Sequence, residues 1–333
     1  MLQFLDYVSS AVTINGRTSQ QNNTMAMQNE TRVVLIGKTG HGKSETGNSI
    51  LNCTDAFLAS SDLCSVTLST RRRTLVTDSK TIAVVDTPGM FDTNVPEHIV
   101  FSEVIKCIGL LAPGPHAFLY VLEVGTRLTK EELETLDKFV QLFGEDLYKF
   151  LIIVFTHKKK LGTKSVQEYA NNAPPLFKKV LNLCNNRIIA IENVQDIADR
   201  QKTVNNLLLM IEELKSRSES FYHHEYFNMA QKVIAERMVE LGKNAKRSDV
   251  LDEIETGGQA FNNLIEKGLG LLVFSILVTA GGYAAAKLIL NVPLAVALEA
   301  SAKRLSKEGT SNVKRVTAAG AKAVASRTTC VII

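Results

Sequence analysis

Residues 33–44 read Val-Val-Leu-Ile-Gly-Lys-Thr-Gly-His-Gly-Lys-Ser, an apolar run followed by the phosphate-binding pattern Gly-x-x-x-x-Gly-Lys-Ser/Thr. The chemistry needs this spacing because the backbone N–H groups of the loop must wrap around phosphate oxygens. Lys43 would neutralise the charge of the β- and γ-phosphates, and the Ser44 hydroxyl can ligate Mg²⁺. Together with a plausible helix over 44–51, the stretch predicts a nucleotide-binding protein.

A second motif, Asp-Thr-Pro-Gly at 86–89, follows an apolar run at 82–85. A buried strand there would deliver Asp86 to the outer shell of the metal ion, and the Gly89 N–H could meet a γ-phosphate and report its presence. The motif is more typical of a GTPase switch than of an ordinary turn.

The segment between the two motifs is where a switch threonine completing the Mg²⁺ shell is expected. It has no strong helical periodicity, and we choose Thr67, with Ser65, Ser69 and Thr70 as rivals. The alternative is that these residues simply favour an extended strand.

Apolar runs at 119–122 and 150–155 predict buried parallel strands, with an amphipathic helix over 130–143 between them. This alternation indicates an α/β fold, a P-loop GTPase domain with a doubly wound, mostly parallel sheet. Ligands of such sheets bind outside the carboxyl ends of the strands, where the phosphate loop, Asp86 and His157 all fall.

The composition sets the remaining bounds. With 333 residues, 45% of them hydrophobic, the chain can form one globular domain and an appendage. The net charge of +4 argues neither for nor against nucleic acid, and we predict no nucleic-acid partner. Five cysteines without Cys-x-x-Cys spacing suggest neither a zinc site nor a disulfide framework. The N-terminus has no basic region followed by a long apolar run, so we expect no secretory signal.

Further stretches make the assignment more specific. The sequence continues the phosphate-loop pattern through 37–51, reads Asp-Thr-Pro-Gly-Met-Phe-Asp at 86–92, Pro-Gly-Pro-His-Ala at 113–117 and Val-Gly-Thr-Arg-Leu-Thr at 124–129. Together these resemble the immunity-associated GTPases of the GIMAP, or avrRpt2-induced, type. Pro-Gly-Pro-His-Ala is the box that this family carries between its second and third nucleotide motifs. The resemblance is strong over 32–220 and weaker to about 240.

The resemblance implies a guanine-nucleotide domain in the septin-like and chloroplast-import-receptor-like branch of GTPases, binding GTP or GDP with Mg²⁺. Ser60 is included among the nucleotide-binding residues because 57–60 is similar to the family's Phe-x-Ser, with one extra residue. Asn193 is included because 184–193 is similar to the segment that lies beside the base. The implied metal ligands are Ser44, Thr67 and Asp86. The implied nucleotide-binding residues are Gly37, Lys38, Thr39, Gly40, His41, Gly42, Lys43, Ser44, Glu45, Ser60, Gly89, His157, Lys158, Lys159 and Asn193.

The fourth nucleotide motif departs from the family. The family's Thr-Arg-Lys-x-Asp-Leu, whose aspartate accepts from guanine N1 and N2, is similar to Thr-His-Lys-Lys-Lys-Leu at 156–161. Lys160 stands where the aspartate should be, and a lysine has donors only. Either guanine is read through backbone carbonyls and Asn193, or selectivity is reduced. We favour GTP.

Hydrolysis is expected to be slow. Met90 follows Gly89 at the position where Ras-type GTPases carry the glutamine that orients the attacking water, and methionine cannot orient water. The resemblance suggests a weak GTPase, producing GDP and phosphate, whose catalysis depends on a second protomer in a homodimer or homo-oligomer. His116 is a candidate catalytic residue at such a face; alternatively, it caps neighbouring backbone within its loop.

Beyond the nucleotide domain, 204–264 has apolar residues at broadly helical intervals and predicts an amphipathic extension packed on the GTPase or on a partner. A long coiled coil is less favoured because the repeat is not sustained. Residues 268–286 carry no charge and have the length of a membrane span, with a buried core helix as the alternative.

The C-terminal Cys330-Val331-Ile332-Ile333 fits a prenylation signal, with basic residues upstream that would suit an anionic membrane surface. A single span would hide Cys330 from cytosolic enzymes, so both signals are compatible only if the apolar stretch lies shallow or forms a hairpin. We therefore expect attachment to the cytosolic face of an intracellular membrane.

The predicted organisation has five parts: a poorly ordered lead-in at 1–30, the GTPase domain at 31–216, the helical extension at 217–267, a membrane-associated apolar segment at 268–298 and a basic tail at 299–333. The function that we predict is a guanine-nucleotide switch that self-associates into a membrane scaffold, with roles in immune defence or cell survival suggested by the resemblance. The rivals are a nucleotide-occupied structural protein that does not turn over and an ATP-using enzyme.

Overall fold

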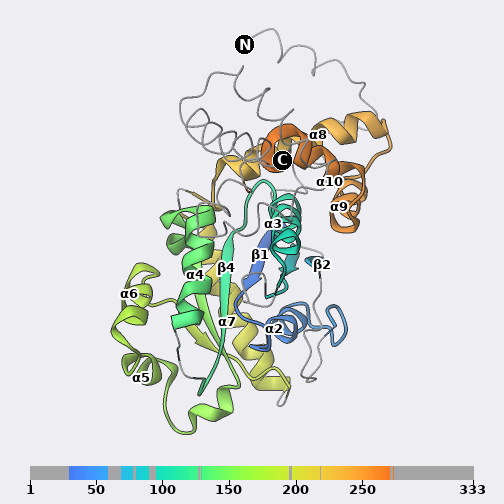
Figure 1. Ribbon diagram of the computed structural model, residues 1–333. Coiled ribbons are helices and arrows are strands. Elements are labelled where there is room, and N and C mark those ends of the chain that lie inside the picture. Colours follow the sequence, from blue (N-terminus) through green and yellow to red (C-terminus); the bar gives the residue numbers. More distant parts are fainter. Residues whose placement is uncertain are drawn as a thin grey trace, which may run out of the picture.

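A computed structural model of the chain describes residues 30–58, 69–77, 80–89, 95–126, 128, 130–194, 197–217, 219–270 and 273. One mixed sheet organises this part of the chain (Figure 1), with strand order β2-β3-β1-β4-β5-β6. The strands are β1 (Glu30–Ile36), β2 (Arg71–Val76), β3 (Thr81–Asp86), β4 (Ala117–Glu123), β5 (Leu151–Thr156) and β6 (Ile188–Ala190). β2 runs antiparallel to β3, and the other pairs are parallel.

Two helical layers cover the sheet. Side chains along each central strand alternate between the two faces, and apolar side chains on both faces must be buried. On β1, Val33 and Leu35 join the core that includes α2 and α7, whereas Val34 and Ile36 join the core that includes α3 and α4. Burial on both faces explains the continuous apolar runs of these strands and confirms the predicted doubly wound, mostly parallel sheet. The elements around it are α2 (Lys43–Ile50), α3 (Glu97–Leu111), α4 (Lys130–Phe143), α5 (Val166–Asn171), α6 (Pro175–Leu183) and α7 (Ile197–Lys215), with the short 3-10 helices η1 (Glu145–Phe150) and η2 (Lys158–Leu161).

A helical extension follows α7. Its elements are α8 (Glu225–Leu241), α9 (Arg247–Thr256), α10 (Gln259–Leu264) and the short π-helix η3 (Ile265–Leu269). The extension packs tightly on α3: a Cβ added at Gly109 would lie 2.8 Å from Leu264 Cδ1 and 3.0 Å from Ile254 Cγ2. Of the two arrangements expected for this stretch, packing on the GTPase domain is therefore the one that the structure shows.

The extension also covers part of the edge strand β2. Glu255 of α9 accepts the Arg72 backbone N–H at 2.8 Å and pairs with the guanidinium groups of Arg71 and Arg73 at 3.2 and 3.0 Å. A carboxylate that binds an outward N–H blunts the strand edge as a template for further pairing.

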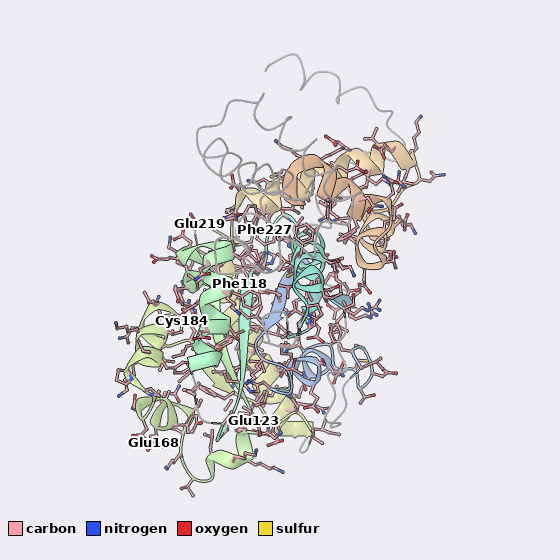
Figure 2. All side chains as sticks on the ribbon, in the orientation of Figure 1. Phe118, Glu123, Glu168, Cys184, Glu219 and Phe227 are labelled. Carbon is pink, nitrogen blue, oxygen red and sulfur yellow. The ribbon has the colours of Figure 1, made fainter. Side chains whose placement is uncertain are left out.

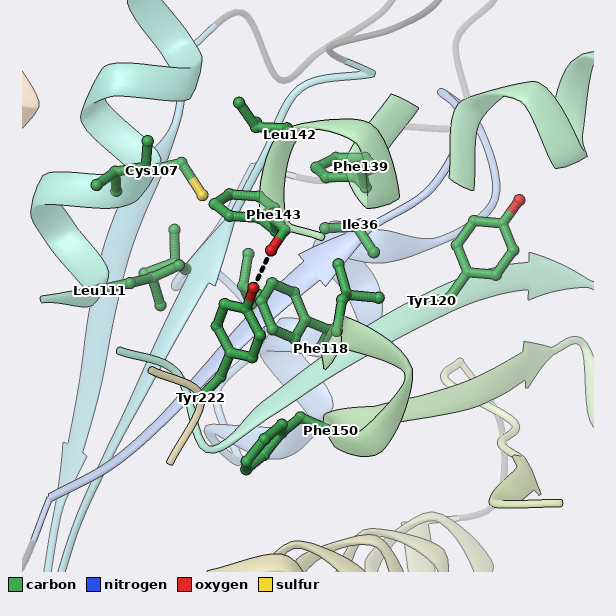
Figure 3. Close-up of a cluster of buried hydrophobic side chains, with 14 of the residues drawn as sticks. Ile36, Cys107, Leu111, Phe118, Tyr120, Phe139, Leu142, Phe143, Phe150 and Tyr222 are labelled. Carbon is green, nitrogen blue, oxygen red and sulfur yellow. Dashed lines mark hydrogen bonds between the residues drawn. The ribbon is translucent and has the colours of Figure 1, made fainter. Parts of the chain in front are cut away.

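Tyr222 forms the joint between α7 and the extension (Figure 3). Its side chain is 1% exposed and its hydroxyl donates to the carbonyl of Phe143, the last residue of α4. Its ring meets Phe118 and Phe150 edge-on, with centroid distances of 5.3 and 5.7 Å. The Tyr222 N–H donates to Pro115 O at 2.8 Å, so the Pro-Gly-Pro-His-Ala loop contacts the chain where it leaves the GTPase domain.

The extension and the carboxyl ends of the strands lie at opposite ends of the sheet. In Figure 2, Glu123 at the end of β4 lies low in the view, and Phe227 of α8 lies above Phe118, near the start of β4. The phosphate loop follows β1 at the same end as Glu123, since β1 and β4 are parallel neighbours. The helices added after α7 therefore leave the expected ligand edge uncovered.

Candidate functional site

The loop 37–42 joins β1 to α2 in a conformation that requires glycine at both ends. Gly37 has φ 138°, and a Cβ there would lie 2.5 Å from the Val121 carbonyl oxygen. Gly42 has φ 84° and is the N-cap of α2. The loop can therefore curl above the sheet and present the N-terminus of a helix, which attracts anions.

Lys43 reaches back over this loop. Its side chain is buried, at 6% exposed, and its Nζ donates to the carbonyl oxygen of Lys38 at 2.9 Å. Thr156, at the end of β5, donates its hydroxyl to the His41 carbonyl at 3.0 Å and ties the loop to the sheet. Burial first, and Lys43 second, lower the pKa of His41, so the imidazole is neutral at pH 7. The loop thus presents the Lys43 ammonium and a set of N–H groups to an incoming phosphate.

The predicted metal ligands from the first two motifs meet in space. Ser44 Oγ donates to Asp86 Oδ2 at 2.7 Å, although the residues lie 42 positions apart in sequence. Asp86 is 1% exposed, and the next residue, Thr87, donates its hydroxyl to Leu35 O at 2.7 Å and fixes the end of β3 beside β1. A hydroxyl and a carboxylate are hard oxygen donors of the kind that Mg²⁺ prefers, so the pair fits this ion.

The loops after β5 and β6 form the neighbouring part of this edge. His157 adopts φ 55° as the N-cap of η2. Lys158 Nζ lies 2.8 and 2.7 Å from the two Asp199 carboxylate oxygens, and its N–H donates to Ile191 O at 3.2 Å. The Lys159 N–H donates to Glu192 Oε2 at 3.1 Å. Backbone and carboxylate contacts therefore join the two loops.

Asn193, the residue predicted beside the base, lies in the loop after β6 and contacts α2. Its Oδ1 accepts from Ser49 Oγ at 2.9 Å, and its Nδ2 donates to Thr46 Oγ1 at 3.1 Å, so the amide is bound to α2. The side chain is only 7% exposed. Asn193 thus anchors the loop after β6 to α2, and its role beside the base stays a prediction.

His116 lies away from the phosphate loop. It precedes β4, at the end of the sheet opposite the phosphate loop, and is 4% exposed. Its Nδ1 accepts the Arg32 N–H at 2.8 Å, and burial first, then Arg32 and Lys215, hold its pKa far below the ordinary value. The histidine is a neutral acceptor for neighbouring backbone, which was the alternative to a catalytic role.

Several predicted residues cannot be placed. Ser60, Thr67, Met90 and Cys330 lie outside the described residues, as does most of the apolar segment 268–298. Gly89 lies within them and is buried after the end of β3. Within the described ranges, no helix is long and apolar enough to cross a bilayer.

The comparisons with known proteins bear on this site. The model of the AIG1 family matches residues 31–241, from the start of β1 to the end of α8. The chain belongs to the AIG1 family. This AIG1 protein is 32% identical over 222 residues to immune-associated nucleotide-binding protein 7 of Arabidopsis thaliana, and 32% identical over 238 residues to protein 8 of the same series. The matches cover 65% and 70% of this chain, and 71% and 64% of those relatives. The resemblance inferred from the motifs is confirmed.

Among solved structures, the AIG1 protein is similar to Toc33 from Arabidopsis thaliana, crystallised with GDP and Mg²⁺. The TM-score is 0.47 and the sequence identity 18%, and the match covers 60% of this chain and 90% of Toc33.

The family match ends before α9 and α10, so these two helices of the extension lie beyond the segment that the family model covers.

Proposed function

We propose that this AIG1-family chain is a guanine-nucleotide-binding switch that holds GTP or GDP together with Mg²⁺. The observation that carries the proposal is the joint placement of Lys43 over the phosphate loop and of Ser44 beside Asp86, at the carboxyl edge of a doubly wound sheet. In such sheets this edge is where nucleotides bind. The sequence supports the same assignment through its Asp-Thr-Pro-Gly motif.

Ser44 and Asp86 would hold the metal ion. Held by these two residues, the ion would supply positive charge that neutralises the phosphates of the nucleotide. Gly89 follows Asp86 closely, so its N–H can respond to a γ-phosphate, and Thr67 is the proposed third metal ligand.

We propose slow hydrolysis that depends on a second protomer. Met90 offers a thioether where an attacking water needs a polar partner, and His116 is bound to backbone at the far end of the sheet. Attachment to the cytosolic face of an intracellular membrane, assembly into a scaffold and a role in immunity are further parts of the proposal. The apolar and C-terminal sequence motifs support the first of these, and the names of the Arabidopsis relatives support the last.

The proposal is tested by competition of GTP, GDP, ATP and ADP against a fluorescent guanine nucleotide on the 333-residue chain. We expect guanine nucleotides to compete at least about tenfold better than adenine nucleotides, a difference of about 1.4 kcal/mol. Equal competition by ADP would contradict the guanine assignment. Phosphate release across a protein concentration series then separates the switch, whose turnover per molecule should rise with concentration, from the structural rival, which releases none.

Substitution of Asp86 by Asn is expected to weaken GTP binding about tenfold in Mg²⁺. The amide can still accept from Ser44, but it loses the negative charge that attracts the metal ion. In excess EDTA, Asp86→Asn and the unaltered protein should bind GTP equally, and titration calorimetry under both conditions measures this. An equal loss in EDTA would show that Asp86 acts on the fold of the loop rather than through Mg²⁺.

A further inference from the structure

At the base-binding edge, the position of the family's aspartate is occupied by Lys160, which offers guanine no acceptor. Guanine donates from its N1–H and its 2-amino group, so a protein that selects it needs an acceptor there, ideally a carboxylate. Lys160 occupies the position of the family's aspartate, and its Nζ lies 2.5 Å from Glu123 Oε1 at the end of β4. The loop after β5 therefore supplies no carboxylate of its own.

The loop after β6 supplies one. Glu192 lies two positions beyond the end of β6, which pairs with β5 through Phe155 and Ala190. Its Oε2 accepts the backbone N–H of Lys159, the residue immediately before Lys160. The carboxylate of Glu192 is thereby held against the very segment where the aspartate is missing.

This carboxylate has unused acceptor capacity. Glu192 is 8% exposed, and among the described residues the Lys159 N–H is its one hydrogen-bond donor. The flanking ammonium groups of Lys158 and Lys160 pair with Asp199 and Glu123 instead. A carboxylate can accept about four hydrogen bonds, so Glu192 has room for further donors beside the Lys159 N–H.

We propose that Glu192 accepts the N1–H and 2-amino group of guanine and replaces the aspartate whose place Lys160 takes. The inference rests on the proposed guanine-nucleotide function and names the residue that selects the base. Asn193 carries no carboxylate, and its amide already contacts Ser49 and Thr46. The competing role for Glu192 is structural: its carboxylate caps η2, whose N-cap residue His157 makes no side-chain cap bond.

Substitution of Glu192 by Gln separates the two roles. The amide oxygen of Gln can still accept the Lys159 N–H, so a cap would survive, but the amide NH₂ would then face the base. That NH₂ opposes the 2-amino group of guanine and suits the 2-oxo group of xanthine. We expect GDP affinity to fall about 10- to 100-fold and the affinity for xanthosine diphosphate to rise, so that the preference between them inverts.

The measurement is competition by GDP, xanthosine diphosphate and ADP on the 333-residue chain and its variants, with the thermal unfolding of each variant recorded. Glu123→Gln is the matched control, because it makes the same change in the other carboxylate at this edge and should keep the order GDP over xanthosine diphosphate. Glu192→Asp keeps the charge but withdraws the carboxylate, so it should weaken GDP binding without inverting the order. It also serves as the test if Glu192→Gln does not fold.

The outcomes are distinguishable. If the unaltered protein prefers GDP, and a folded Glu192→Gln variant keeps that preference unchanged, the inference is overturned while the proposed function stands. Unchanged GDP affinity in Glu192→Asp would overturn it as well. If the unaltered protein binds GDP no better than ADP, the guanine function itself fails. Inversion in Glu192→Gln alone, without inversion in Glu123→Gln, would establish Glu192 as the specificity-determining residue.

Discussion

Substitution of Lys43 by Ala is expected to lower the affinity of the chain for GTP and GDP by about 100-fold or more. The Lys43 ammonium lies across the phosphate loop, 2.9 Å from the Lys38 carbonyl, where it can bind two phosphate groups. Hydrogen bonds to charged groups contribute about 1.5 to 3 kcal/mol each, and about 1.4 kcal/mol corresponds to a tenfold change in affinity. Two such bonds account for the expected loss. Titration with a fluorescent GDP derivative measures it.

The control for this variant is Lys178→Ala, which removes the same side chain from an exposed position on α6. It should bind nucleotide as the unaltered protein does. Both variants should unfold at similar denaturant concentrations in the absence of nucleotide. If Lys43→Ala kept full affinity, the loop 37–42 would not be a phosphate site, and the proposed function would lose the observation that carries it.

The phosphate loop and the metal pair could be predicted from the sequence for different physical reasons. The loop is local: its glycine spacing and the flanking strand and helix lie within one short stretch, so no long-range contact is needed to recognise it. The pairing of Ser44 with Asp86 is not local, but it follows from topology, because parallel strands bring their carboxyl ends to one edge. The first prediction depends on a local pattern, and the second on a rule that holds for any doubly wound sheet.

The direction of individual side chains could not be predicted in the same way. Sequence places Glu192 and Asn193 next to each other in one loop, but only the structure shows that Asn193 turns to α2 and Glu192 to Lys159. His116 is similar, since its sequence position between two nucleotide motifs does not show that it lies at the far end of β4. Neighbouring loop residues can point to different partners, and the packing of the whole domain decides which.

The extension illustrates a second limit. Its helical periodicity predicted an apolar face, but periodicity cannot say what covers that face. The structure shows that α3 covers it, through contacts as close as those at Gly109, and that Tyr222 anchors the start of the extension. The contribution of the extension to the stability of the GTPase domain can therefore be tested by substituting Tyr222.

Substitution of Tyr222 by Ala is expected to lower the free energy of unfolding by about 3 to 5 kcal/mol, the range for removing a large buried aromatic side chain. Its ring packs edge-on against Phe118 and Phe150, and its hydroxyl satisfies the terminal carbonyl of α4 at Phe143. Burial raises the pKa of Tyr222, so the hydroxyl remains a donor throughout the physiological range. Denaturant-induced unfolding followed by far-UV circular dichroism measures the loss.

Tyr222→Phe separates the ring from the hydroxyl. It keeps the aromatic packing and removes the donor to Phe143, so we expect a loss of only about 1 to 2 kcal/mol. Because Tyr222 and the phosphate loop lie at opposite ends of the sheet, the folded Tyr222→Ala variant should retain GDP affinity. A fall in affinity in the folded variant would instead mean that the extension is coupled to the nucleotide site through β4. If Tyr222→Ala lowered the free energy of unfolding by less than about 1 kcal/mol, the side chain would not stabilise the core in the way its burial indicates.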